Sequence, residues 1–194
     1  MKKKIIALVL ACIICVGIGV GGTLAWLTAQ TNEVKNTFST SDIGVELSET
    51  SATYKMVPGW TISKDPKAKV TSGSEDCFLF VKVEKSNNFD RFMDYAIDSQ
   101  WTLLSDGVYY IEIDQAAEKN ADFNILGEGS AIYNGVTYTW ADNQVLVKPS
   151  VTKGDMAALT DETKPTLTFT AYASQLYKNN TEKFTAAEAW GNIT

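Results

Sequence analysis

The N-terminal thirty residues combine a basic start, a long apolar run and an exit of small side chains. Lys2, Lys3 and Lys4 precede apolar sequence from Ile5 to Val20, and Gly21-Gly22-Thr23-Leu24-Ala25-Trp26-Leu27 follows. This order is typical of a secretory signal peptide, because the lysines stay on the cytoplasmic side while the apolar run enters the bilayer as a helix. The pattern predicts that residues 1–25 are removed and that the protein is secreted.

The predicted cleavage follows Ala25, because Thr23 and Ala25 supply the small side chains that a signal peptidase accepts, with Trp26 after the cut and Ala29 as a second site. Two alternatives remain open. The stretch from Ile5 to Leu27 is long enough for a membrane anchor, although its glycines weaken the helix and no basic cluster follows it. Lipoprotein processing at Cys12 is the other alternative, disfavoured because apolar sequence continues well past that residue.

Beyond residue 41 the polar and apolar positions mostly follow the period of β-strands. The pattern predicts strands over residues 43–47, 77–85, 101–104, 108–113, 131–133, 136–140, 144–148 and 165–177. Ile43, Val45 and Leu47 are expected on the buried face of the first strand. Turn residues separate the strands: Val57-Pro58-Gly59-Trp60, Ser105-Asp106-Gly107 and Asn134-Gly135, of which the last is a strong signal for a two-residue hairpin.

Two strands carry a clear division of faces. In 77–85, Leu79, Val81 and Val83 are expected on one face, and Phe78, Phe80, Lys82 and Glu84 on the other. In 165–177, Leu167, Phe169, Ala171 and Ala173 are expected to face inward.

Helix signals are few. Apolar spacing predicts a short helix over 89–97, and the capping-box spacing of Thr185 and Glu188 predicts one helical turn through Trp190. The predicted fold is an all-β, jelly-roll-like antiparallel β-sandwich over residues 42–194, with one or two short helices. The N-terminal signal helix and an extended arm over residues 26–41 precede it.

The net charge of the chain excludes two classes of binding partner. Its net charge is −6, and residues 1–25 hold three of the 17 basic residues and none of the 23 acidic ones, so the remainder carries −9. Such an acidic protein repels nucleic acid and anionic membrane surfaces. We therefore expect no nucleic-acid partner, and membrane contact only through an uncleaved signal segment.

The chain contains no histidine, which removes the Ser-His-Asp triad and the usual zinc ligand. Adjacent carboxylates at Glu75-Asp76 and Asp161-Glu162 are expected to be solvated turns rather than a metal site, so no catalytic residue, metal or cofactor is predicted. Cys77, the one cysteine after residue 25, is expected to be a buried strand residue; pairing with a cysteine of another chain is the alternative. A cell-surface module that binds a glycan or a host protein is a further possibility, which an exposed cluster of Trp60, Trp101, Trp140 or their tyrosine neighbours would favour.

Several segments together resemble the TasA/camelysin family of exported proteins, and most closely its alternate-signal-mediated branch. The resemblance rests on Gly21 to Thr28, Val34 to Ser39, Ile43 to Glu49, Val57-Pro58-Gly59, the strand from Cys77 to Glu84, Ala171 to Gln175, and Phe184 to Trp190; residues 86–164 match only loosely. It implies processing by a SipW-type signal peptidase and a jelly-roll sandwich.

The resemblance also implies a non-enzymatic structural protein of the cell surface or biofilm matrix in Gram-positive bacteria. In such fibres the N-terminal arm of one subunit adds as a strand to the next, so the expected partners are other copies or a TasA-like matrix protein. Trp26, Leu27, Val34 and Phe38 are the apolar points of the arm that are expected to enter a neighbour. The alternative is that the arm folds back or stays disordered. Camelysin-like metallopeptidase activity is disfavoured, because no His-Glu-x-x-His motif is possible.

Overall fold

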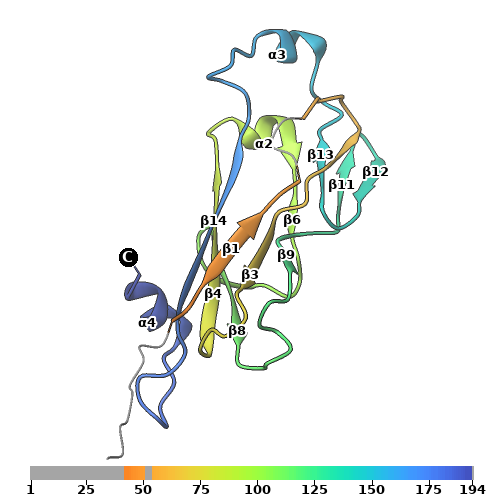
Figure 1. Ribbon diagram of the computed structural model, residues 1–194. Coiled ribbons are helices and arrows are strands. Elements are labelled where there is room, and N and C mark those ends of the chain that lie inside the picture. The colour runs from red at the N-terminus through yellow and green to blue at the C-terminus, as the bar shows by residue number, and fades with distance from the viewer. Residues whose placement is uncertain (1–41, 51–53, 194) are drawn as a thin grey trace, which may run out of the picture. The chain divides into compact units, whose positions relative to one another are not determined.

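The computed structural model describes residues 42–50 and 54–193, and antiparallel strands dominate it (Figure 1). The strands are β1 Val45–Ser48, β2 Thr61–Ser63, β3 Lys67–Val70, β4 Cys77–Lys85, β5 Met93–Asp94, β6 Ala96–Ile97, β7 Thr102–Ser105, β8 Val108–Ile113, β9 Phe123–Asn124, β10 Leu126–Gly127, β11 Gly129–Tyr133, β12 Val136–Trp140, β13 Gln144–Val147 and β14 Leu167–Gln175. Three short helices accompany them in this part of the chain: α2 Phe89–Phe92, α3 Lys153–Ala157 and α4 Ala186–Gly191. None of these helices is long and apolar enough to cross a membrane.

The strands form an all-β sandwich, as predicted. One layer is a four-stranded sheet in the order β14-β4-β8-β7, and the other combines three small sheets in the orders β1-β3-β9, β2-β13-β5 and β10-β6. All their pairings are antiparallel. The hairpin β11-β12 forms a sheet of its own. The predicted signal helix lies outside the described residues.

The central strand β4 separates two hydrophobic clusters, as its alternating pattern predicts. Leu79, Val81 and Val83 enter the main core between the layers, together with residues of β3, β8, β13 and α2. Phe78 and Phe80 lie on the opposite face, in a smaller cluster covered by α4. The inward face of β14 is also confirmed, since Leu167, Phe169, Ala171 and Ala173 all pack on the main core.

The predicted turns are present. Gly59 has a φ of 78° and Trp60 N–H donates to the Val57 carbonyl at 3.0 Å, as a turn with Pro58 and Gly59 in its central positions requires. Asn134 and Gly135 have φ of 52° and 79°, which gives the type I′ hairpin expected for this pair.

Three predictions about local structure are corrected. The helix expected over 89–97 ends at Phe92, because Met93 and Asp94 pair with β13 as strand β5. Leu47 is 41% exposed, although a buried side chain was expected, because it lies near the end of an edge strand at the rim of the core. Among the described residues there are three short helices where one or two were predicted, since α3 is stabilised by a capping box between Thr152 and Asp155.

Candidate assembly surface

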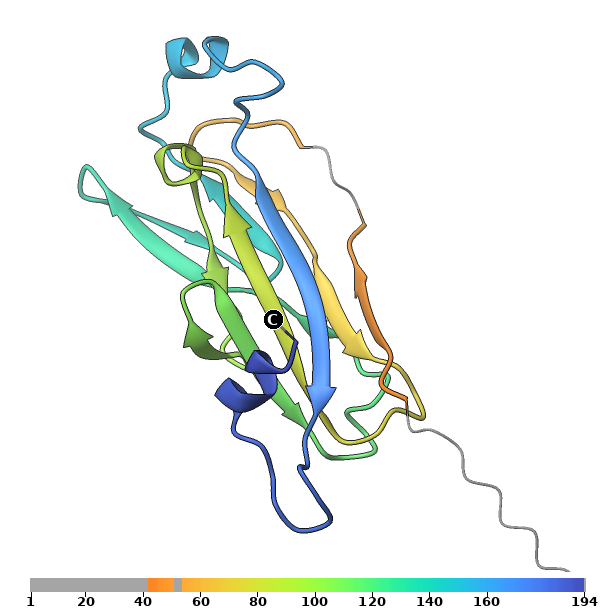
Figure 2. The same cartoon turned by 90° about the vertical axis from the view of Figure 1, so that its left-hand side faces the viewer.

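Two strand edges on one flank of the sandwich lack a strand partner in the described part of the chain. β14 bonds to β4 on one side only, and β1 bonds to β3 on one side only. β1 and β14 run beside each other in both views and contact one another (Figure 2). This flank therefore presents unpaired backbone N–H and C=O groups from both layers, which is a template for an additional strand.

The β14 edge has the side chains that such pairing needs. Its nine residues, Leu167 to Gln175, include no charged side chain, so it lacks the lysines that commonly protect an edge. Phe169 is 9% exposed, while Ala171 and Ala173 beside it are only half-buried. Part of the surface of each of these two alanines is therefore exposed at the edge, where an added strand could cover it.

A partly buried ion pair holds the chain after β1 against β14. Lys64 Nζ lies 2.7 Å from Glu49 Oε1, with the two side chains only 11% and 22% exposed. The same ammonium lies 5.3 Å from the centre of the Phe169 ring and 5.4 Å from that of Tyr54, within the distance of a cation–π contact to each. Tyr54 donates its hydroxyl to Glu49 at 2.7 Å, and burial followed by this hydrogen bond raises the pKa of Tyr54. This tether connects the chain that leaves β1 to the inward face of β14.

The predicted arm residues Trp26, Leu27, Val34 and Phe38 lie outside the described residues, as do the cleavage residues Thr23, Ala25 and Trp26. The described chain begins at Asp42, three residues before β1. In the sequence, the predicted arm of residues 26–41 therefore precedes β1, one of the two strands that form the open flank.

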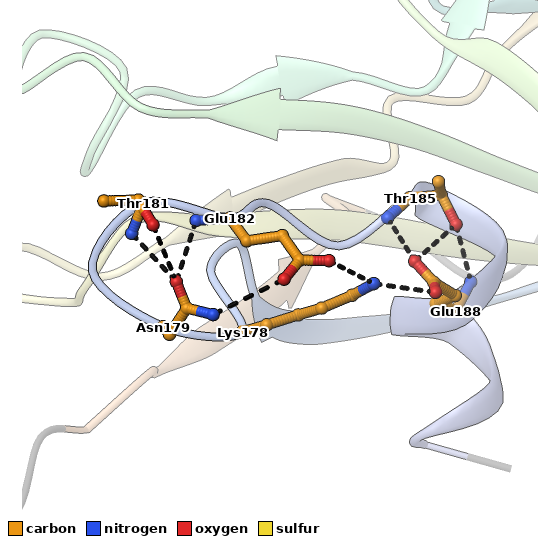
Figure 3. Close-up of polar contacts among 6 residues, drawn as sticks. All are labelled: Lys178, Asn179, Thr181, Glu182, Thr185 and Glu188. Carbon is orange, nitrogen blue, oxygen red and sulfur yellow. Dashed lines mark hydrogen bonds and ion pairs between the residues drawn. The ribbon is translucent and has the colours of Figure 1, made fainter.

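Helix α4 packs on Phe78 and Phe80, on the outer face of the four-stranded sheet. Residues 178–188 form a network of polar contacts that leads into this helix, which we call the C-terminal clamp (Figure 3). Lys178 Nζ pairs with Glu188 at 2.8 Å and with Glu182 at 3.2 Å. Glu188 also accepts the backbone N–H and hydroxyl of Thr185, completing the predicted capping box of α4. The Lys178 contact and then these Thr185 bonds lower the pKa of Glu188 to about 2. α4 thereby holds Trp190 against the ring of Phe80, with 5.3 Å between ring centres.

The three tryptophans considered for glycan stacking do not gather on the surface. Trp60 is 68% exposed, but Trp101 and Trp140 are each 6% exposed. Trp101 also donates its indole N–H to the Asn124 carbonyl at 2.7 Å, as a structural tryptophan does. An exposed cluster of these three side chains is therefore absent.

Three of the four carboxylates in the two adjacent pairs form ion pairs or hydrogen bonds. Asp76 pairs with Lys119 at 2.8 Å, and Asp161 with Lys164 at 2.5 Å. Glu162 accepts the hydroxyl of Thr160, which lowers its pKa. Within residues 42–50 and 54–193, no group of three or more acidic or cysteine side chains is arranged to hold a metal ion.

Cys77 is fully buried on β4, which confirms the predicted strand environment. Burial makes its thiol inaccessible to solvent. Burial also raises the pKa of this thiol to about 11, so the thiol is protonated at neutral pH.

Comparison with known proteins adds no relative: the sequence matches no family model and no curated protein, and the fold matches no solved structure. The open flank itself was not predicted from the sequence. The signals that bear on it were the arm that leads into β1 and the uncharged strand over 165–177, but neither tells which strands lack a partner.

Proposed function

We propose that this protein is a secreted, non-enzymatic structural protein of the cell surface or biofilm matrix. In this proposal a signal peptidase removes residues 1–25, and the freed arm of one copy adds as a strand to the open flank of the next. The observation that carries the proposal is the coincidence, at one flank, of an uncharged open edge on β14 and the strand β1 into which the arm leads. The resemblance to the TasA/camelysin family supports the same assignment.

The physical chemistry of the flank favours strand addition. An added strand would form backbone hydrogen bonds with the edge, and its alternate side chains would point to the core side, beside the partly buried Ala171 and Ala173. Because the arm and the acceptor edge are different parts of the same chain, the contact is head to tail. Such a contact does not close on itself unless the rotation happens to form a ring, so repetition generates a filament.

The proposal predicts that a charge on the acceptor edge blocks assembly. Thr168 is exposed on β14, and Thr168→Lys places an ammonium beside the edge, as natural edge strands do to prevent pairing. Thr102→Lys is the matched control, because Thr102 is also exposed and lies on β7, the opposite edge of the same sheet. In electron micrographs of the chain beginning at Trp26, filaments are expected for the control and not for Thr168→Lys. If both variants form filaments and both have unchanged circular dichroism, β14 is not the acceptor strand.

A surface module that binds a glycan is the second candidate, and the exposed Trp60 is the observation that favours it. One exposed indole ring gives a single stacking platform, since Trp101 and Trp140 are buried. Glycan-array binding that disappears in Trp60→Ala would support this candidate over the matrix role.

A further inference from the structure

The hairpin β11-β12 has two open edges of its own. It bonds to no other strand of the described chain, and it extends away from both layers of the sandwich (teal in Figure 2). An isolated two-stranded hairpin is only marginally stable in water, so contacts with the sandwich or with a partner must stabilise it.

The inner side of the hairpin is fixed to the sandwich. The hydroxyl of Tyr133 donates a hydrogen bond to Asp94 on β5, and the rings of Tyr133 and Tyr138 are 6.1 Å apart in an edge-to-face arrangement. At the base, the ring of Trp140 lies so close to Gly129 that a Cβ there would be 2.3 Å from it. These contacts hold the hairpin in place and leave its outer side free.

The turn geometry determines which backbone groups point outward. A two-residue hairpin turn makes Tyr133 and Val136 a hydrogen-bonded pair, and bonded and non-bonded pairs alternate along an antiparallel ladder. The pairs Ile132–Thr137 and Ser130–Thr139 are therefore the non-bonded ones, whose N–H and C=O groups point away from the partner strand. All four of these residues are exposed, and Ile132 is 71% exposed.

The charge distribution indicates what pairs with these edges. Residues 129–140 contain no charged side chain, whereas the whole chain carries a net charge of −6. Two copies of an acidic protein repel over most of their surface, but edge-to-edge contact of this hairpin opposes no like charges within the paired strands. A strand edge is also self-complementary, because it pairs antiparallel with its own copy about a two-fold axis. We propose that the β11-β12 hairpin is a self-association surface through which two copies of this chain join edge to edge.

This surface is separate from the open flank, so it is tested without the arm. The chain beginning at Asp42 retains both hydrophobic clusters and is expected to show a concentration-dependent monomer–dimer equilibrium in sedimentation velocity. Ile132→Lys and Thr137→Lys place a charge beside the β11 and β12 edges respectively. At least one of them is expected to weaken the dimer by tenfold or more in Kd, on the order of 1.4 kcal/mol. Thr102→Lys, on β7, is the control and should leave the dimer unchanged.

A proline variant distinguishes edge pairing from a general effect of charge. At the edge that the lysine variants identify, Ile132→Pro or Thr137→Pro removes an outward N–H without removing a bond of the hairpin ladder, and the same loss of dimer is expected. A wild-type chain that stays monomeric at every concentration would assign the hairpin to another partner and overturn the proposal. A dimer that survives both lysine variants would do the same. One combination of results would refute this inference alone: the chain beginning at Trp26 forms filaments, but the chain beginning at Asp42 does not dimerise. The proposed function would then still stand.

Discussion

The tether between Glu49 and Lys64 gives the sharpest test of how the open flank is maintained. The two side chains are 22% and 11% exposed, and the ammonium lies over the rings of Tyr54 and Phe169. Glu49→Gln keeps an oxygen that accepts the Tyr54 hydroxyl, so it removes the negative charge and little else. The charge of Lys64 then remains in a mostly apolar surrounding without its counter-charge.

The expected cost lies between two known limits. Removing one partner of a fully buried pair costs about 3–5 kcal/mol, and an exposed pair contributes about 0–1 kcal/mol. For this partly buried pair we expect Glu49→Gln to lower the free energy of unfolding by about 2 kcal/mol, which corresponds to a fall in Tm of roughly 4–8 °C for a domain of this size. The double variant Glu49→Gln/Lys64→Met should cost less than the sum of the single variants, with a coupling energy of about 1–2 kcal/mol.

Urea unfolding followed by tryptophan fluorescence measures these differences. Glu46→Gln is the matched control, because Glu46 lies on β1 and pairs with Lys69 at 3.0 Å while its side chain is 56% exposed. Its cost should not exceed about 0.5 kcal/mol. If Glu49→Gln costs no more than this control, or if the two changes in the double variant are additive, the tether does not stabilise the flank.

Three further predictions concern titrating groups. The lowered pKa of Glu188 means that its carboxylate stabilises the folded state only while it is charged. As the pH falls from 4.5 toward 2, protonation of Glu188 should release α4 and shift the indole NMR signal of Trp190 before the rest of the protein unfolds. The variant Glu188→Gln should show this shifted signal already at neutral pH. The pKa of Tyr133 is raised above 10.0, first by burial and then by its hydrogen bond to Asp94. The neutral hydroxyl therefore stabilises the folded state below pH 10, and this contribution is lost as the pH rises above 10. In urea unfolding, the free energy of unfolding of Tyr133→Phe should fall less at alkaline pH than that of the wild type. Cys77, with its pKa raised to about 11, should react with a thiol reagent at pH 8 only after urea unfolds the chain, and rapid reaction of the native protein would contradict its burial.

Much of the fold could be predicted because several local signals agree with the tertiary structure. The alternating apolar positions of β4 gave both of its faces, and Asn134-Gly135 gave the position and type of a hairpin turn. Strand β3, with the sequence Lys-Ala-Lys-Val, was missed, although Ala68 and Val70 are fully buried, because two lysines and a small side chain conceal its apolar face. The helix expected over 89–97 ends at Phe92, because Met93 and Asp94 pair with β13, and the local apolar spacing does not reveal this distant partner.

The candidate assembly surfaces were less predictable for a different reason. Whether a strand edge is open depends on which strands lie beside it, and that is a property of the topology rather than of any single segment. β14 and the β11-β12 hairpin were both predicted as strands, but their sequences do not tell that β14 lies at the end of a sheet or that the hairpin pairs with no other strand.

In the proposed assembly, the arm of one copy adds to the open flank of another. Electron microscopy of two purified forms, one beginning at Trp26 and one beginning at Asp42, tests this strand addition. We expect filaments from the first form, none from the second, and shorter filaments when a peptide of residues 26–41 competes for the flank. Filaments from both forms, or from neither under the conditions of secretion, would contradict it.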